Sequence, residues 1–97
     1  MLMNQITIDF IGHSRILTRQ KKIQLNIESG TSYGEVIKII ATKYPALVGQ
    51  VISPDGEGLY GSNMFNRNGE HMIQEDEMGH SPEDGDNLIL MSVLAGG

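Results

Sequence analysis

The C-terminal stretch of the chain, residues 87–97, reads NLILMSVLAGG and contains the strongest strand pattern in the sequence. Apolar residues occupy both faces of this strand, which is typical of a strand at the centre of a sheet. Either both faces are covered by other parts of the protein, or one face carries a binding patch. After the strand only Ala95-Gly96-Gly97 remain, so the chain ends in a short tail of small residues.

Two further strands are expected at the start of the chain. Residues 5–10 and residues 23–28 each alternate between apolar and polar side chains, which is the period of a half-buried strand. We expect the two strands to pair in antiparallel fashion across a connection at residues 12–20.

A helix of about three turns is expected next. Ser32 and Glu35 have the spacing of a capping box, with Thr31 as an alternative cap. Pro45 disfavours helical geometry at the residue before it, so the helix ends at or just before Tyr44. Apolar residues recur every three or four positions and form one face of this helix: Tyr33, Val36, Ile37, Ile40, Ala41 and Tyr44.

The order of the elements predicts an α+β protein. Between the helix and the last strand we expect a short buried segment (47–52), a loop (53–58), a strand (59–66), a hairpin turn at Asn68-Gly69, a short strand (70–73) and a loop (75–82). A right-handed crossover places the last strand beside the first. This arrangement is the β-grasp (ubiquitin-like) fold, a mixed sheet of four to five strands with one main helix packed across it. We expect residues 1–97 to form a single domain with a flexible tail at residues 94–97.

Composition excludes several classes of function. The 97 residues include no cysteine, which removes disulfides, thiol nucleophiles, zinc–thiolate sites and iron–sulfur clusters. The net charge of −5 argues against a nucleic-acid partner. No apolar run approaches the roughly 18–20 residues that span a bilayer, and the first residues lack the pattern of a secretory signal. We therefore expect a cytoplasmic protein without a membrane partner.

The charges are unevenly distributed along the sequence. No lysine or arginine follows Arg67. This acidic segment is either a solvated surface or a means of steering the C-terminal end toward a basic partner surface. Its seven acidic residues are Glu70, Glu75, Asp76, Glu77, Glu83, Asp84 and Asp86.

Three motifs carry a resemblance to a known family. They are Phe10-Ile11-Gly12 followed by Arg15 and Thr18, Tyr44-Pro45 followed by Leu47, and Asp84-Gly85-Asp86 before an apolar strand and a terminal Ala95-Gly96-Gly97. With these motifs the chain resembles the ubiquitin-like sulfur carriers over nearly its whole length. It is most similar to the small subunit of molybdopterin synthase, and more loosely similar to the thiamine-pathway sulfur carrier and to ubiquitin-like modifiers. It departs from the family at Arg19, where glycine is common.

The resemblance implies a function for the tail. The Gly97 carboxylate would be adenylated by an ATP-using, ubiquitin-activating-like enzyme and then converted to a thiocarboxylate. The sulfur would pass to an acceptor, such as the large catalytic subunit of molybdopterin synthase. Leu94, Ala95 and Gly96 would thread a narrow channel of the partner, which residues with small or no side chains can enter. The chain itself would bind no cofactor, since ATP is used by the partner, and would not be an enzyme.

The last strand also predicts a docking patch. If Leu88 and Leu90 face the helix, then Ile89, Met91 and Val93 face the opposite way. This apolar stripe beside the tail would bind the activating enzyme and the acceptor, unless the loop at residues 70–82 covers part of it.

Other residues predict no site. His13, His71 and His80 lack metal-ligand spacing, and consecutive acids such as residues 75–77 are usually solvated, so no metal is expected. Two alternative functions remain open. A protein modifier would be conjugated to lysines through Gly97, whereas a plain interaction module predicts no effect from deleting Gly96-Gly97.

Overall fold

The structure, a computed structural model, describes residues 2–93. The predicted flexible tail at residues 94–97, and with it Gly97, lies outside the described residues.

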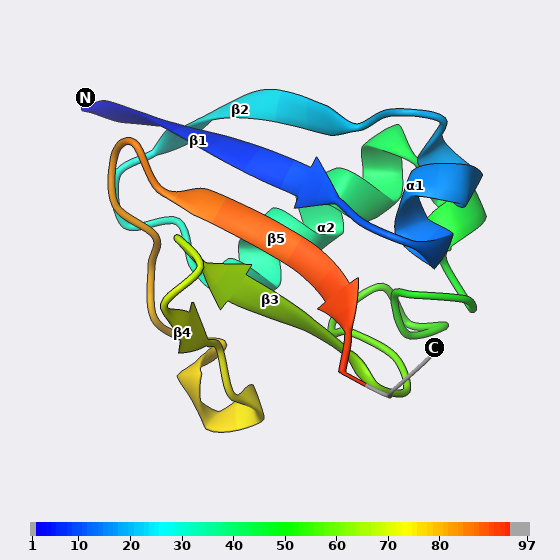
Figure 1. The fold of residues 1–97 in the computed structure, drawn as a ribbon. Coiled ribbons are helices and arrows are strands. Elements are labelled where there is room, and N and C mark those ends of the chain that lie inside the picture. Colours follow the sequence, from blue (N-terminus) through cyan, green and yellow to red (C-terminus); the bar gives the residue numbers. More distant parts are fainter. Residues whose placement is uncertain (1, 94–97) are drawn as a thin grey trace.

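A five-stranded mixed sheet forms the centre of the protein (Figure 1). The strands follow the order β2-β1-β5-β3-β4, and β5 is parallel to β1 but antiparallel to β3. The predicted class, a mixed sheet with one main helix across it, is confirmed, and the most apolar strand is the central one. The strands are β1 (Met3–Phe10), β2 (Lys22–Glu28), β3 (Asn63–Arg67), β4 (His71–Met72) and β5 (Asn87–Ser92).

The main helix, α2 (Tyr33–Lys43), covers one face of this sheet. Its predicted capping box is present: the Ser32 hydroxyl accepts a hydrogen bond from the Glu35 N–H, and the Glu35 carboxylate accepts one from the Ser32 N–H, both at 3.1 Å. The apolar face of α2 packs on the inward side chains of the strands. Sixteen buried apolar residues form this core, with Tyr33, Phe10 and Phe65 as the largest.

A short helix, α1 (His13–Thr18), occupies the segment that the sequence predicts only as a connection. Six residues are too few to establish a helical period, so local pattern gives little indication of it. Side-chain hydrogen bonds hold it in place instead. Ser14 donates to the Ile11 carbonyl at 3.1 Å, Thr18 donates to the Ser14 carbonyl at 2.8 Å, and Arg15 Nε donates to the Phe10 carbonyl at 2.8 Å.

The segment between α2 and β4 differs in detail from the expectation. The short helix η1 (Pro45–Leu47) starts a buried segment as predicted, with Leu47, Val51 and Ile52 fully buried. The third strand begins at Asn63 rather than at residue 59. Leu59 forms an isolated antiparallel bridge with Ile52, the Tyr60 N–H donates to the Val51 carbonyl at 2.8 Å, and residues 61–62 form a turn.

The predicted hairpin turn between β3 and β4 is confirmed. Asn68 and Gly69 both have positive φ, 58° and 74°, and the Glu70 N–H donates to the Arg67 carbonyl at 3.0 Å. Two consecutive positive φ values are what a tight hairpin of this kind requires, and Asn-Gly supplies them at low cost. A second short helix, η2 (Glu75–Glu77), follows β4. Among the residues that the structure describes, no helix is long and apolar enough to cross a membrane.

Candidate functional site

The carboxyl end of β5 is where the chain leaves the sheet. The Val93 N–H donates to the Ser62 carbonyl at 3.0 Å, and the hydroxyls of Ser62 and Ser92 lie 2.8 Å apart. These contacts hold the end of β5 against the residues before β3. The predicted tail residues Leu94, Ala95, Gly96 and Gly97 lie beyond this point, outside the described residues. The tail therefore starts from a well-anchored position at the sheet edge.

The alternation expected in β5 is observed. Leu88 and Leu90 are fully buried on the side of α2, whereas Ile89 and Met91 are partly exposed on the opposite side of the sheet. Val93 follows on the same side and is 48% exposed. We call the sheet surface opposite α2 the open face.

The strand register adds two methionines that the sequence did not indicate. Met64 of β3 lies opposite Met91 on the open face, and Met72 of β4 lies opposite Asn66. Because β4 is only two residues long, its period is invisible in the sequence. The four side chains Met64, Met72, Ile89 and Met91 form what we call the sheet patch.

Asn66 lies within the sheet patch, opposite Ile89. Its Nδ2 donates to Met72 Sδ at 3.1 Å, while its Oδ1 is buried and has no hydrogen-bond partner among residues 2–93. A buried carboxamide oxygen without a donor is uncommon in folded proteins and costs free energy. Sequence reasoning did not find this residue, since nothing in its local pattern distinguishes it.

The loop between β4 and β5 lies on the other side of the sheet. The Met78 carbonyl accepts from the Gly34 N–H at 3.0 Å, and the His80 carbonyl accepts from the Tyr33 N–H at 2.8 Å. Both donors belong to the first turn of α2. Residues 78–80 therefore run beside the helix, which argues against this part of the loop covering the open face.

Three of the seven acidic residues predicted as a group, Glu83, Asp84 and Asp86, lie in the turn before β5. Asp86 accepts from Asn68 Nδ2 at 3.0 Å and from the Glu83 N–H at 2.8 Å, and Asp84 accepts from the Gln5 N–H at 2.7 Å. The tail leaves from the other end of β5, about 17 Å away at roughly 3.4 Å per residue. These acids are therefore poorly placed to guide the tail itself.

No metal site is evident. The part of the chain that the structure describes holds no group of three or more His, Asp or Glu side chains able to bind an ion. His71 Nε2 lies 2.9 Å from Glu77 Oε2. The Gln74 N–H, and after it His71, lower the pKa of Glu77 below its usual value by stabilising the carboxylate. His71 and Glu77 thus stabilise the β4–η2 connection rather than forming a site.

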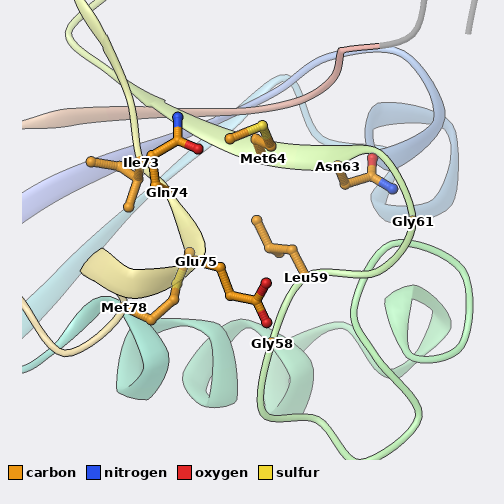
Figure 2. A pocket seen from close by; sticks show the side chains of 9 residues that line it. All are labelled: Gly58, Leu59, Gly61, Asn63, Met64, Ile73, Gln74, Glu75 and Met78. Carbon is orange, nitrogen blue, oxygen red and sulfur yellow. The ribbon is translucent and has the colours of Figure 1, made fainter.

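A pocket of about 310 Å³ opens between β3, η2 and the turn at residues 58–61 (Figure 2). Leu59, Ile73 and Met78 give it apolar walls, and the Glu75 side chain extends across it toward Gly58. Asn63 and Met64 of β3 also line the pocket, and Glu75 is the single titratable lining residue. It offers no paired acid and base and no nucleophile.

Comparison with known proteins finds a similar sequence and several similar structures. No protein-family model matches the chain. It is 27% identical over 93 residues to small archaeal modifier protein 3 of Haloferax volcanii, a match that spans 96% of this chain and 99% of the relative.

Solved structures share the fold. The crystal structure of SAMP1 from Haloferax volcanii superposes with a TM-score of 0.79 at 22% identity, covering 97% of this chain and all of that one. A Pyrococcus furiosus protein, provisionally assigned as subunit 1 of a molybdopterin converting factor, superposes with a TM-score of 0.74 at 13% identity over 94% of this chain and 99% of its own.

Proposed function

Because the chain is a ubiquitin-like β-grasp protein whose homologues include small archaeal modifier proteins, we propose that it is a carrier whose reactive group is the carboxylate of Gly97. The observation that carries this proposal is the anchored exit of the chain at Val93. Four residues remain beyond it, ending in Gly-Gly, and an extended tail of that length reaches about 13–14 Å. That is enough to enter the active site of another protein.

The proposed chemistry begins with activation, since a carboxylate is a poor electrophile. A Gly97 oxygen attacks the α-phosphorus of ATP, pyrophosphate leaves, and an acyl-adenylate forms. A hydrosulfide equivalent then attacks the carbonyl carbon, AMP leaves with its electron pair, and a thiocarboxylate results. Its sulfur is a better nucleophile than a carboxylate oxygen, as thiolates are. The partner enzymes supply the catalysis, and this chain carries the group.

We further propose which protein accepts the sulfur and in which compartment the reaction occurs. The motif Asp84-Gly85-Asp86, the apolar strand and the terminal Ala95-Gly96-Gly97 resemble the small subunit of molybdopterin synthase. The acceptor would then be the large catalytic subunit of that enzyme, acting in molybdopterin synthesis. Since the activation needs ATP, the proposed location is the cytoplasm.

The sheet patch, extended by Val93, is the proposed docking surface for these partners. Ile89, Met91 and Val93 lie on the open face directly before the tail, and Met64 widens the apolar area. A flexible methionine surface can adapt to more than one partner. This suits a carrier that must bind an activating enzyme and an acceptor in turn.

A protein modifier is the second candidate function. It is favoured by the 27% identical relative, which is named as a small archaeal modifier protein. The same acyl-adenylate chemistry serves both functions. In the modifier, a lysine amine of another protein attacks the Gly97 carbonyl carbon of the acyl-adenylate, AMP leaves with its electron pair, the amine loses a proton, and an isopeptide bond forms.

Reconstitution tests the proposal. The purified chain is incubated with ATP, sulfide and the ubiquitin-activating-like enzyme of the same organism, and pyrophosphate release and intact mass are followed. We expect pyrophosphate release and a gain of about 16 Da, which is sulfur in place of oxygen. A matched chain lacking Gly96-Gly97 should give neither. Equal pyrophosphate release from both chains would contradict a role for Gly97.

A further inference from the structure

We propose that α1, beside the root of the tail, carries a basic docking surface for an acidic region of the enzyme that activates Gly97. We call this the α1 surface, and it consists of Ile11, Arg15, Ile16 and Arg19. The inference rests on the proposed function, because it assumes that the tail is activated by a partner.

The position of the α1 surface follows from two hydrogen bonds and one strand pairing. The Ile11 N–H donates to the Leu90 carbonyl at 3.2 Å, and the Ser14 hydroxyl lies 3.4 Å from the same oxygen. Since β1 and β5 are parallel, with Phe10 opposite Leu90, Ile11 continues the register beside Met91. Helix α1 therefore lies at the end of the sheet toward which β1 and β5 both run, which is also the end where the chain leaves β5 (Figure 1).

Its side chains are exposed. Ser14 and Thr18 are the buried residues of α1, which leaves Arg15, Ile16 and Arg19 on the outer side, although Arg15 Nε also donates to the Phe10 carbonyl at 2.8 Å. Residues three and four apart share one side of a helix, so Arg19 is a neighbour of both Ile16 and Arg15. Ile16 is 72% exposed and Ile11 is 44% exposed. Two exposed isoleucines beside arginines match the apolar and arginine-rich composition of protein interfaces.

The charge around α1 is opposite to that of the whole protein. Between Asp9 and Glu28 the sequence has no acidic residue. Four of its seven basic residues lie there: Arg15, Arg19, Lys21 and Lys22. On a chain of net charge −5, this clustering favours a partner surface that is acidic.

Arg19 gives a second, independent observation. It ends α1 in the left-handed conformation, at φ 59° and ψ 25°, which favours glycine over residues with a Cβ. Its guanidinium makes no hydrogen bond or ion pair with any other described residue, and its side chain is exposed. The Arg19 N–H donates to the Arg15 carbonyl at 2.8 Å and closes α1, but the side chain adds no hydrogen bond or ion pair within residues 2–93. Strained positions cluster at functional sites, so an exposed arginine in this conformation is a candidate for a binding role.

The acidic end of the molecule strengthens the argument. Asp84 and Asp86 lie at the start of β5, whereas α1 lies beside its carboxyl end. An acidic partner surface attracts the α1 end and repels the opposite end. The molecule therefore approaches the partner with the end that carries the tail. Charge separation of this kind raises association rates in a salt-dependent way.

The test compares three single variants in the adenylation assay with the full chain, ATP and the ubiquitin-activating-like enzyme of the same organism. Arg19→Gly and Ile16→Ser alter the α1 surface. Lys38→Gln is the matched control, since Lys38 is an exposed basic residue in the middle of α2 that meets Glu57 at 3.6 Å. We expect Arg19→Gly and Ile16→Ser to raise KM about five- to tenfold at unchanged kcat, as loss of a binding contact does. Lys38→Gln should leave KM within about twofold.

Two further readouts separate docking from folding. Arg19→Gly should raise Tm because the strain at φ 59° is relieved, so its weaker binding is not caused by unfolding. The KM of the wild type should rise with salt more steeply than that of Arg19→Gly. If both α1 variants keep the wild-type KM and salt dependence, the α1 surface is not a docking site, although Gly97 is still activated. If the wild type itself is not adenylated, the proposed function is wrong, and the partner assumed here is wrong with it.

Discussion

Gly97 is the residue on which the proposed function depends most directly. It has no Cβ, so its carboxyl carbon can be approached closely in a narrow active site. Gly97→Ala places a methyl group beside that carbon. We expect the rate of adenylation, measured as pyrophosphate release, to fall by about tenfold or more. A tenfold decrease corresponds to an increase of about 1.4 kcal/mol in the activation free energy.

The folded structure should be unaffected by Gly97→Ala, because the buried core residues all lie between Ile6 and Leu90. Circular dichroism and Tm serve as the control for folding. A variant that adenylates at the normal rate would count against the mechanism as a whole.

Asn66 is the second informative residue, because its Oδ1 is buried without a donor. Asn66→Leu removes the unsatisfied oxygen and keeps a side chain of similar size. We expect the free energy of unfolding to rise by up to about 1 kcal/mol. The gain is reduced by the loss of the weak hydrogen bond from Asn66 Nδ2 to Met72 Sδ. Urea denaturation measures this change, with Asn63→Leu as a matched control at the other end of β3. A destabilised Asn66→Leu variant would show that the carboxamide is satisfied in solution.

Strand β5 links the core to the open face through its alternation. Leu88 and Leu90 complete the core, whereas Met91 is partly exposed in the sheet patch. Met91→Gln should therefore weaken binding to the activating enzyme about tenfold, a size typical of an interface residue that contributes to binding. Isothermal calorimetry checks the affinity, and thermal denaturation checks that the fold is intact.

The control for Met91→Gln is Gln24→Ala on β2, at the far side of the same face. This variant should bind as the wild type does. Unchanged affinity in Met91→Gln would remove the sheet patch from the proposed function.

Helix α2 depends on its capping box, which is sensitive to pH. Hydrogen bonds from the Ser32 backbone, and then from its side chain, lower the pKa of Glu35 below its usual value. A carboxyl group whose pKa is lower in the folded state stabilises the fold above its unfolded pKa of about 4.3. That contribution is lost as the pH falls through the folded value.

We therefore expect Glu35→Gln to reduce the difference in the free energy of unfolding between pH 7 and pH 3, measured by urea titration. Ser32→Ala should cost about 1 kcal/mol at pH 7, since it removes the cap itself. Glu57→Gln is the control, because the Glu57 carboxylate is exposed and pairs with the exposed Lys38 at 3.6 Å. An equal pH response in Glu35→Gln and the wild type would contradict the role of the capping box.

The elements that the sequence predicted are those with a strong local signal. Strands β1, β2 and β5, helix α2 and the turn at Asn68-Gly69 each have a clear period or turn chemistry. Helix α1 was missed because it is six residues long and is held by hydrogen bonds from Ser14, Arg15 and Thr18 to backbone carbonyls. The predicted start of β3 is too early because Leu59 and Tyr60 pair with Ile52 and Val51 rather than with the sheet, and a turn at residues 61–62 precedes β3.

The residues of the proposed docking surface could be predicted from the sequence only where they lie on or directly after β5. Ile89, Met91 and Val93 follow from the alternation of β5. Met64, Met72 and Asn66 reach the same face through pairing between distant strands, which no local pattern encodes. The strain at Arg19 likewise becomes visible only in the backbone angles.

At the scale of the whole molecule, the fold places the acidic turn at Asp84 and Asp86 and the exit of the tail at opposite ends of β5. The parallel pairing of β1 and β5 gathers α1, the sheet patch and the exit of the tail at one edge. The turn at Asp84 and Asp86 stands at the opposite edge. The sequence left two interpretations of the acidic segment open. The position of Asp84 and Asp86, away from the tail, supports a solvated surface for this part of the segment rather than one that guides Gly97 to a basic partner.

The most direct test of the central proposal is the intact mass of the protein recovered from its own cells, with and without alkylation of reactive sulfur. We predict a form about 16 Da heavier, alkylated at one sulfur and absent when Gly97 is deleted. Since the chain has no cysteine, any alkylated thiol must come from the carried group. Unmodified protein accompanied by conjugates on other proteins that depend on Gly97 would support the modifier instead. Finding neither form would contradict a chemical role for the tail.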